Sequence, residues 1–518
     1  MFVKSRSLLI CFFAMFIVGG SVHPVVVAQT TTTTTTPQNM LDLKAANLPG
    51  LLGERDTLYG ESITGIGDYN HDGYGDMIIG GRAWNGWQGK VWIYYGSPQG
   101  PSTKADFTII GEPNIQDSGI CMGHTVVNLG DVNGDGINDF AAGGPGSWGG
   151  WDVGRLYIFY GNPQSTPSKA SQSNQNLTSP IKFDWFAESF TRAGDFNGDG
   201  YNDLIVGAPG TSNPADGSAP FETGHAYIFL GSPNGFSQTP DITMRDTLNY
   251  TAFGLVVGGE GDVNGDGYSD VMVGASWTNN HTGRAFLYTG SANPDPNPTP
   301  AITFTGPTEQ SNMGFFVRIL KDVNNDGYDD IAVKYTNTTG DQYQGLVNIY
   351  YGRPDLTNLT TPDIVLKGND FQDDFGYVFN NVGDLNNDGY NDFAVGAPGT
   401  IYGQTGKVYV YYTGPNFDNK PDRIYVGENG GDKFGYWVAG TDLDGDNKPD
   451  LLMSALYYDQ IGKVYIDLSG NGTLRAPPTE MINRIGPTLL FVGLLGGVIA
   501  LVVVMQRKQK INLKLPFT

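Results

Sequence analysis

One nine-residue pattern, Asp-x-Asn-x-Asp-Gly-x-x-Asp, occurs seven times along this sequence of 518 residues. The first residues of successive copies lie 58 to 67 positions apart. Only the seventh copy departs from the pattern, with Asp at its third position and Asn at its sixth. A motif repeated this regularly indicates one structural unit used seven times. The copies begin at Asp68, Asp131, Asp195, Asp262, Asp322, Asp384 and Asp442.

Short apolar segments surround every copy. Examples are "DLIVGAP" at 203–209 and "GKVYVYYTG" at 406–414, and a run opening with Phe-Gly precedes the copies, as in "FGYVFNNVGD" at 375–384. Runs of four to eight residues rich in Val, Ile, Tyr and Phe and bounded by Gly or Pro are typical of strands. Four strands per unit, repeated seven times, predict an all-β, seven-bladed β-propeller over residues 40–470. A solenoid is the alternative, but a closed ring hides its strand edges better.

The ring must also close, and the last unit lacks a fourth strand. The segment "MLDLKA" at 40–45 precedes the first copy and has no other assignment. We therefore expect this N-terminal segment to complete the seventh blade.

The repeated pattern has the chemistry of a hard-cation site. Side-chain oxygens at positions 1, 3, 5 and 9, with a backbone carbonyl at 7, suit Ca²⁺, which takes six to eight oxygen ligands. An EF-hand needs a Glu at position 12 and flanking helices, whereas position 12 is Ala142 in the second copy and Val206 in the third. Mg²⁺ fits less well because it retains its waters. The alternative is a set of Asx-rich hairpin turns without metal, but such turns do not explain an Asp at position 9 in all seven copies.

We expect up to seven structural Ca²⁺ ions, which would offset much of the net charge of −23. The same acidity argues against nucleic-acid binding, which needs a basic surface. The predicted ligands are Asp68, Asn70, Asp72, Tyr74, Asp76, Asp131, Asn133, Asp135, Ile137, Asp139, Asp195, Asn197, Asp199, Tyr201, Asp203, Asp262, Asn264, Asp266, Tyr268, Asp270, Asp322, Asn324, Asp326, Tyr328, Asp330, Asp384, Asn386, Asp388, Tyr390, Asp392, Asp442, Asp444, Asp446, Lys448 and Asp450, with the residue at position 7 offering its carbonyl.

The unit "FG … GD.N.DG..D..VGAP … G.VYVYYG" resembles the FG-GAP repeat of integrin α-subunit heads, over essentially the whole region between the two ends. The resemblance implies a seven-bladed propeller with calcium in hairpin loops on one face and ligand contacts largely on the other. The regular spacing leaves no room for an inserted ligand-binding domain, no leg domains follow, and "QRKQKINLKLPFT" lacks a Gly-Phe-Phe-Lys-Arg motif. An integrin β-type partner is therefore not expected.

The two ends predict export and a single membrane span. Residues 1–28 have the layout of a secretory signal peptide, for which an uncleaved anchor is the alternative, and a Thr-rich spacer follows at 29–39. After a short stalk at 471–484, residues 485–505 are uncharged and long enough to cross a bilayer. Basic residues after them place the tail at 506–518 in the cytoplasm. Six Asn-x-Ser/Thr sequons suggest a glycoprotein, and Cys121 has no cysteine partner once Cys11 is removed.

A ligand is expected on the face opposite the calcium loops. The loops between second and third strands must lie there, and they contain several aromatic residues that suit glycan stacking or protein hot spots. Packing between blades is the alternative. These residues are Trp84, Trp87, Trp148, Trp151, Trp277 and Tyr402.

These features predict a calcium-stabilised cell-surface propeller that mediates adhesion or binds an extracellular protein or glycan. A structural envelope or surface-lattice component is the alternative. A polysaccharide-acting enzyme is least favoured, because Gly-x-Ser-x-Gly is absent and no histidine has a visible partner; we expect no catalytic residues.

Overall fold

The computed structural model describes residues 12–18, 21–27, 40–46, 50–113, 119–146, 154–162, 166–181, 184–210, 224–248, 251–337, 344–370, 372–399 and 403–468. The chain divides into two units, residues 1–40 and 41–518. In the first unit, β1 (Phe12–Val18) pairs antiparallel with β2 (Ser21–Val27). The predicted signal peptide covers this hairpin, and its cleavage stays a prediction.

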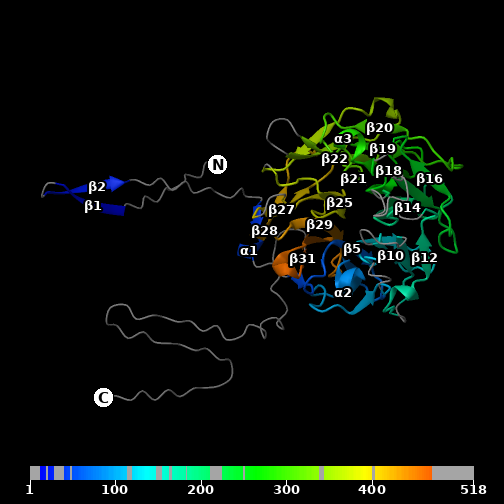
Figure 1. Ribbon diagram of the computed structural model, residues 1–518, viewed down its shortest axis with the longest axis horizontal. Helices are drawn as coiled ribbons and strands as arrows, with labels where there is room; N and C mark the ends of the chain where they lie inside the picture. Colours follow the sequence, from blue (N-terminus) through cyan, green and yellow to red (C-terminus); the bar gives the residue numbers. More distant parts are fainter. Residues whose placement is uncertain are drawn as a thin grey trace, which may run out of the picture. The chain divides into compact units, whose positions relative to one another are not determined.

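Seven antiparallel sheets form the second unit and surround a central opening (Figure 1). The first three strands of every sheet follow one another in chain order from the inner strand outward, as predicted for propeller blades. The first three blades are β5 (Ser62–Gly67), β6 (Asp76–Gly81), β7 (Lys90–Tyr94) and β8 (Phe107–Ile110); β9 (Thr125–Gly130), β10 (Asp139–Gly144), β11 (Arg155–Phe159) and β12 (Gln175–Thr178); and β13 (Ser189–Gly194), β14 (Asp203–Ala208), β15 (His225–Phe229) and β16 (Ile242–Arg245).

The remaining four blades follow the same order, and the last two also take strands from the N-terminal side. They are β17 (Val257–Gly261), β18 (Asp270–Ala275), β19 (Arg284–Tyr288) and β20 (Ile302–Thr305); β21 (Val317–Leu320), β22 (Asp330–Asn337), β23 (Gln344–Tyr350) and β24 (Ile364–Lys367); β25 (Val378–Gly383), β26 (Asp392–Ala397), β27 (Thr405–Tyr411), β28 (Arg423–Gly430) and β3 (Met40–Asp42); and β29 (Phe434–Thr441), β30 (Asp450–Ala455), β31 (Lys463–Asp467) and β4 (Gly50–Leu52).

An N-terminal strand closes the ring, but the prediction named the wrong residues. The strand beside β31 is β4, with Leu51 opposite Val464, whereas β3 lies beside β28 of the sixth blade. The linker length explains the difference. β4 ends ten positions before β5 begins, close to the eleven between β24 and β25, while β3 ends twenty positions before β5.

The hydrophobic core lies between neighbouring blades. One cluster joins Ile78 and Ile93 of the first blade to Phe140 and Tyr157 of the second, and all four are buried. Second strands such as β14 are buried at every residue because both of their faces are covered by other blades. This is why they appear in the sequence as unbroken apolar runs.

The glycines of the repeat allow the blades to approach closely. Gly254, in the turn before β17, has a φ of +87°. Its carbonyl oxygen would lie 2.0 Å from a Cβ added at Gly207 of β14 in the preceding blade. A side chain at either position would force the blades apart. The Phe-Gly and Val-Gly-Ala-Pro elements are therefore two halves of one inter-blade contact.

The helical segments of the described residues are three or four residues long. They are α1 (Leu43–Ala46), α2 (Trp84–Trp87), α3 (Thr278–His281), η1 (Ala170–Gln172), η2 (Leu356–Asn358) and η3 (Tyr458–Gln460). None of the helices in the described part of the chain is long and apolar enough to cross a membrane. The predicted spacer, stalk, membrane span and tail, at 29–39, 471–484, 485–505 and 506–518, lie outside the described residues.

Candidate functional sites: the aspartate loops and the opposite face

All seven aspartate loops connect the first and second strands of their blades, so they lie on one face of the ring. Each is closed by its leading aspartate. In the first loop, Asp72 N–H donates to Asp68 Oδ1 and Gly73 N–H donates to Asp68 Oδ2, each at 3.0 Å. The corresponding bonds occur in the other six loops. The loop fold therefore has a backbone explanation that involves no ion.

The sixth position has the backbone conformation predicted for it. Glycine there has a φ between +87° and +95° in the first six loops, as at Gly136 and Gly389. Asn447 takes this position in the seventh loop with a φ of +61°. Asparagine tolerates the left-handed region better than other residues that carry a side chain.

The ninth aspartate is fully buried in every loop and links the loop to its blade. In the second loop, Val132 N–H donates to Asp139 Oδ2 at 2.8 Å, and Gly161 N–H, after the third strand, donates to Oδ1 at 2.7 Å. The same two bonds occur in loops one and three to six. We name this pair of bonds the aspartate latch. These two bonds give the aspartate at position 9 a structural role, which turn chemistry alone does not provide. The presence of Asp at position 9 therefore does not by itself require a metal.

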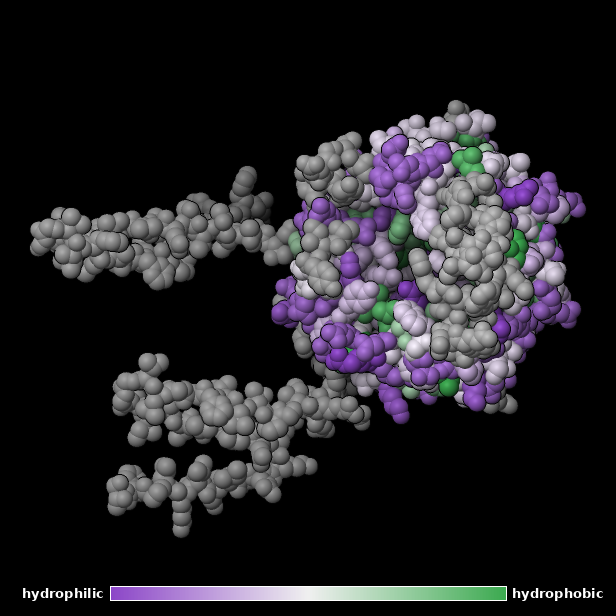
Figure 2. All heavy atoms as spheres, in the orientation of Figure 1, coloured by the Kyte–Doolittle hydropathy of each residue, from purple (hydrophilic) through white to green (hydrophobic). Residues whose placement is uncertain are grey.

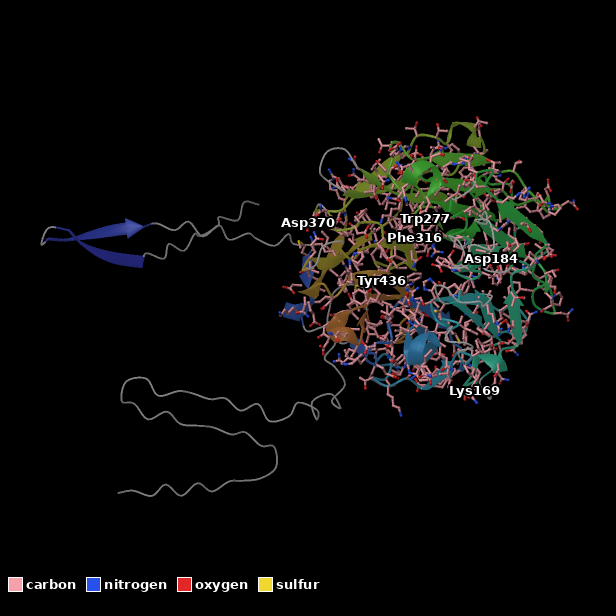
Figure 3. The ribbon with its side chains drawn as sticks, viewed as in Figure 1. Lys169, Asp184, Trp277, Phe316, Asp370 and Tyr436 are labelled. Carbon is pink, nitrogen blue, oxygen red and sulfur yellow. The ribbon has the colours of Figure 1, made fainter. Side chains whose placement is uncertain are left out.

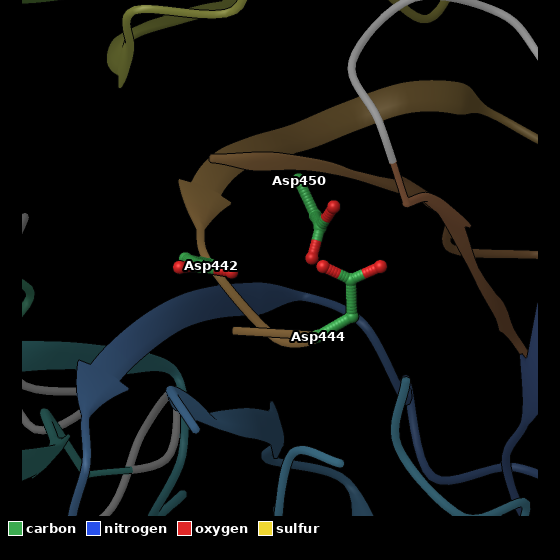
Figure 4. A group of neighbouring side chains, drawn as sticks. All are labelled: Asp442, Asp444 and Asp450. Atoms are coloured by element: carbon green, nitrogen blue, oxygen red, sulfur yellow. The ribbon is translucent and has the colours of Figure 1, made fainter. Parts of the chain in front are cut away.

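The seventh loop differs from the other six. Leu443 N–H donates to Asp450 Oδ2 at 2.8 Å, but Asp450 Oδ1 is buried and has no hydrogen-bond partner among the residues that the structure describes. Asp442, Asp444 and Asp450 each place a carboxylate oxygen within 4.8 Å of the others (Figure 4). Asp444 stands where the other loops have asparagine, which brings a third carboxylate into the group. An orphaned buried oxygen among three carboxylates is the donor set that a hard cation fits.

Burial raises the pKa of the ninth aspartates, against the lowering effect of the backbone N–H donors, and the other carboxylates of each loop raise it further. The pKa of Asp139 rises to about 7 and that of Asp450 to about 8. The pKa of Asp330, which accepts two backbone bonds, also rises to about 8, so burial and the neighbouring carboxylates outweigh the backbone donors in both loops.

The aromatic residues predicted on the opposite face do not form one cluster. Trp87 and Trp277 are 46% and 40% exposed. They belong to α2 and to the turn before α3, which lie on opposite sides of the central opening (Figures 1 and 3). Trp84 donates to Glu54 at 3.1 Å and lies beneath Lys90, so it is partly used in packing. Trp148, Trp151 and Tyr402 lie outside the described residues.

Backbone strain accompanies the exposed tryptophans. Asn85, Gly86 and Trp87 all have positive φ, as do Asn279, Asn280 and His281 beside Trp277. Consecutive left-handed residues cost roughly 1–2 kcal/mol each for residues with a side chain. Strain of this kind gathers at ligand-contacting sites more often than elsewhere.

A group of charged residues at the central channel was missed from the sequence. His124 Nε2 lies 3.3 Å from Glu188 Oε1, and its Nδ1 lies 3.3 Å from Glu61 Oε1. Arg82 Nε lies 3.1 Å from the same Glu61 oxygen. Burial lowers the pKa of His124, but the two glutamates outweigh burial and raise it to about 9. His124 therefore has partners, contrary to the sequence interpretation.

One signal could have located this group. A residue with positive φ lies at or near the start of each inner strand, and the residue that follows it lines the channel. These following residues are Glu61, His124, Glu188, Leu255, Phe315, Tyr377 and Tyr436, all of which line the central cavity. The first three blades thus contribute charge and the last four contribute apolar and aromatic groups. Figure 2 shows the central hollow, with apolar residues visible inside it.

Comparison with known families agrees with this architecture. Residues 189–229, 253–288, 375–411 and 434–467 match the FG-GAP repeat. Four segments of the chain thus match the FG-GAP repeat, and its sequence is similar to that of integrin α subunits. It is 32% identical to "Integrin alpha-6" of Gallus gallus over 270 residues, which cover 49% of this chain and 24% of the relative. Against "Integrin alpha-6" of Homo sapiens it is 31% identical over 223 residues, covering 42% and 18%.

A further relative of the FG-GAP propeller has an enzyme's name. "Phosphatidylinositol-glycan-specific phospholipase D" of Dictyostelium discoideum is 28% identical over 362 residues, covering 58% of this chain and 37% of the relative. The propeller chain spans less than two fifths of the length of each of these three relatives. The likeness therefore supports the repeat and its fold.

Proposed function

We propose that this chain is a calcium-stabilised cell-surface propeller that binds an extracellular protein or glycan on the face opposite its aspartate loops. Calcium supplies positive charge among carboxylates that otherwise repel. The seventh loop supports this part of the proposal most directly, because Asp442, Asp444 and Asp450 converge and one buried oxygen of Asp450 has no donor. In the other loops, oxygens such as Asp139 Oδ1 accept one backbone bond and retain a second lone pair.

The observation that carries the binding function is the exposure of Trp87 and Trp277 on strained turns. Large aromatic rings left in solvent at a rigid position lose little entropy on binding and offer a flat apolar surface. Because the two rings lie on different blades, the proposed ligand either spans the central opening or contacts one turn at a time.

A binding screen tests the function. The purified full chain is applied in calcium to immobilised glycans and to matrix proteins, and hits are repeated with Trp87→Ala and Trp277→Ala. We expect at least one variant to lose about tenfold or more in affinity, the scale of an aromatic hot spot. Tyr201→Ala is the control, because Tyr201 is 39% exposed on the aspartate-loop face.

Two results would contradict the proposal. Equal losses for Tyr201→Ala and the tryptophan variants would remove the opposite face from the account. Ordered self-assembly of the chain on calcium addition, without binding to any immobilised ligand, would favour the surface-lattice function instead.

A further inference from the structure

The central channel contains a cavity of about 480 Å³ whose charged residues fall into two groups. The first group is Glu61, His124 and Glu188, whose charges are matched with each other and with Arg82. The second group lies on the inner strands of blades three to five and consists of Arg192, Glu260 and Arg318. A cavity of this size is typical of sites for small organic ligands.

The second group holds two guanidinium groups and one carboxylate. Glu260 forms an ion pair with Arg192. No carboxylate in the described part of the chain lies within ion-pairing distance of Arg318. The neighbouring Lys321 side chain donates to the backbone oxygen of Glu260 and contacts Asp329, so it adds no anion to the group. The group therefore has an unmatched positive charge, within a protein whose net charge is −23.

Arg318 itself has unused donor capacity. It donates from Nη2 to Asn380 Oδ1, and its Cζ lies 5.7 Å from the centre of the Phe316 ring. Its Nε is inaccessible to solvent and has no acceptor among the described residues. A guanidinium offers five N–H groups in a planar fork that matches a carboxylate. The Arg318 side chain is partly buried, and a partly buried cation without its anion is unfavourable, so such a site is expected to gain from an anionic ligand.

The cavity also supplies apolar walls. Phe190, Val257, Phe316 and Ile319 line it near the arginines, and Phe316 lies beside the central opening (Figure 3). A bare inorganic anion would leave these walls without contacts. An acid with an apolar body would satisfy the fork and cover the walls together.

We propose that the channel binds a carboxylate with a small apolar body, held by the guanidinium of Arg318 with Arg192 beside it. The carboxylate is either that of a free organic acid or the C-terminal carboxylate of a short peptide. This site is independent of the tryptophan turns and of the aspartate loops, so it stands or falls separately from the proposed function.

Saturation-transfer NMR on the purified full chain tests the site with benzoate as the probe and benzamide as its neutral counterpart. We expect benzoate to bind at concentrations up to about 10 mM, the range of a weak small-ligand site, and benzamide not to bind. Arg318→Gln should weaken benzoate at least about tenfold, the scale of a charge-assisted bidentate contact. The control Arg245→Gln, on the outer strand β16, should leave binding unchanged.

Glu260→Gln provides a test that predicts a gain in benzoate affinity and not a loss. This change removes the carboxylate that is ion-paired with Arg192 and repels an incoming anion, so benzoate should bind several-fold more tightly. A folded Glu260→Gln variant also decides the matter if Arg318→Gln does not fold. Peptides ending in phenylalanine, with a free or an amidated C-terminus, identify the source. Tighter binding of the free-acid peptide than of benzoate indicates a chain terminus, and weaker binding indicates a free acid.

Three outcomes overturn the site. They are no benzoate signal, equal signals from benzoate and benzamide, and benzoate binding that Glu260→Gln does not strengthen.

Discussion

The second and the seventh aspartate loops have the same length and share the aspartates at positions 1, 5 and 9, yet their ninth aspartates have different surroundings. Asp139 accepts backbone N–H bonds on both oxygens. Asp450 accepts one such bond and leaves Oδ1 buried without a donor, beside Asp442 and Asp444. The comparison teaches that one motif can be closed by hydrogen bonds alone or can leave a place that a cation would fill. It predicts that dependence on calcium is greatest in the seventh loop.

The largest expected effect comes from breaking an aspartate latch. Asp392→Ala removes the acceptor for Leu385 N–H and Thr413 N–H, both at buried positions. Two buried donors without partners cost about 2–4 kcal/mol. We expect this loss in denaturant unfolding both with calcium and with chelator. A loss confined to calcium-containing buffer would mean that the sixth loop, too, is closed by the ion.

At the seventh loop, we expect one substitution to change the melting temperature in opposite directions in chelator and in calcium. Asp450→Asn removes a buried carboxylate that has one donor, which should raise the melting temperature by a few degrees in chelator, about 1 kcal/mol. In calcium the same variant should melt lower than the parent chain, because it lacks a ligand. Asp392→Asn is the matched control and should melt lower in both buffers. A lower melting temperature for Asp450→Asn in chelator would contradict the comparison.

The pH dependence separates the metal-free from the calcium-bound state. In chelator the folded pKa of Asp139 is about 7 and that of Asp450 about 8, against about 3.9 in the unfolded chain. An aspartate whose pKa is raised on folding stabilises the folded state fully below about pH 3.9. This contribution to the free energy of unfolding is lost as the pH rises through 7 to 8. The melting temperature in chelator should therefore fall between pH 5 and about pH 8.

In calcium the trend should reverse, because the ion binds the ionised carboxylates. Asp450→Asn should flatten the part of the chelator curve above about pH 7. Parallel curves with and without calcium would show that no ion competes with protons in these loops.

The smallest effect on the free energy of unfolding is expected at the sixth position of the seventh aspartate loop. Asn447 has a φ of +61° where the other loops have glycine. Asn447→Gly relieves strain but adds unfolded-state entropy, so the free energy of unfolding should change by less than about 1 kcal/mol. Gly200→Val, at a φ of +91°, should cost more, because a β-branched residue is poorly tolerated there. Equal effects would mean that backbone conformation does not limit this position.

Much of the propeller was predictable because its signals are local and repeated. The spacing of the aspartates predicted seven blades, and the apolar runs of 203–209 and 406–414 predicted their strands; the structure confirms both. The closing strand was misassigned because β3 and β4 are both short and only the distance to β5 separates them. That signal was in the sequence and was not used.

The sites were less accessible to sequence reasoning because they depend on contacts between blades. The latch partner of Asp139 is the backbone of Gly161, 22 positions away, and a backbone donor leaves no mark in a motif. The group of Glu61, His124 and Glu188 is assembled from three blades, with one residue from each. The separation of Trp277 from α2, which contains Trp87, across the central opening depends on the closure of the ring and not on a local motif.

Thermal unfolding of the purified full chain, in calcium, in magnesium and after treatment with chelator, tests the central proposal most directly. The account predicts that the melting temperature falls by many degrees on chelation, returns fully when calcium is added back, and returns only in small part with magnesium. An unchanged melting temperature after complete removal of divalent cations would contradict it, and would leave the aspartate latches and leading aspartates as a sufficient explanation of all seven loops.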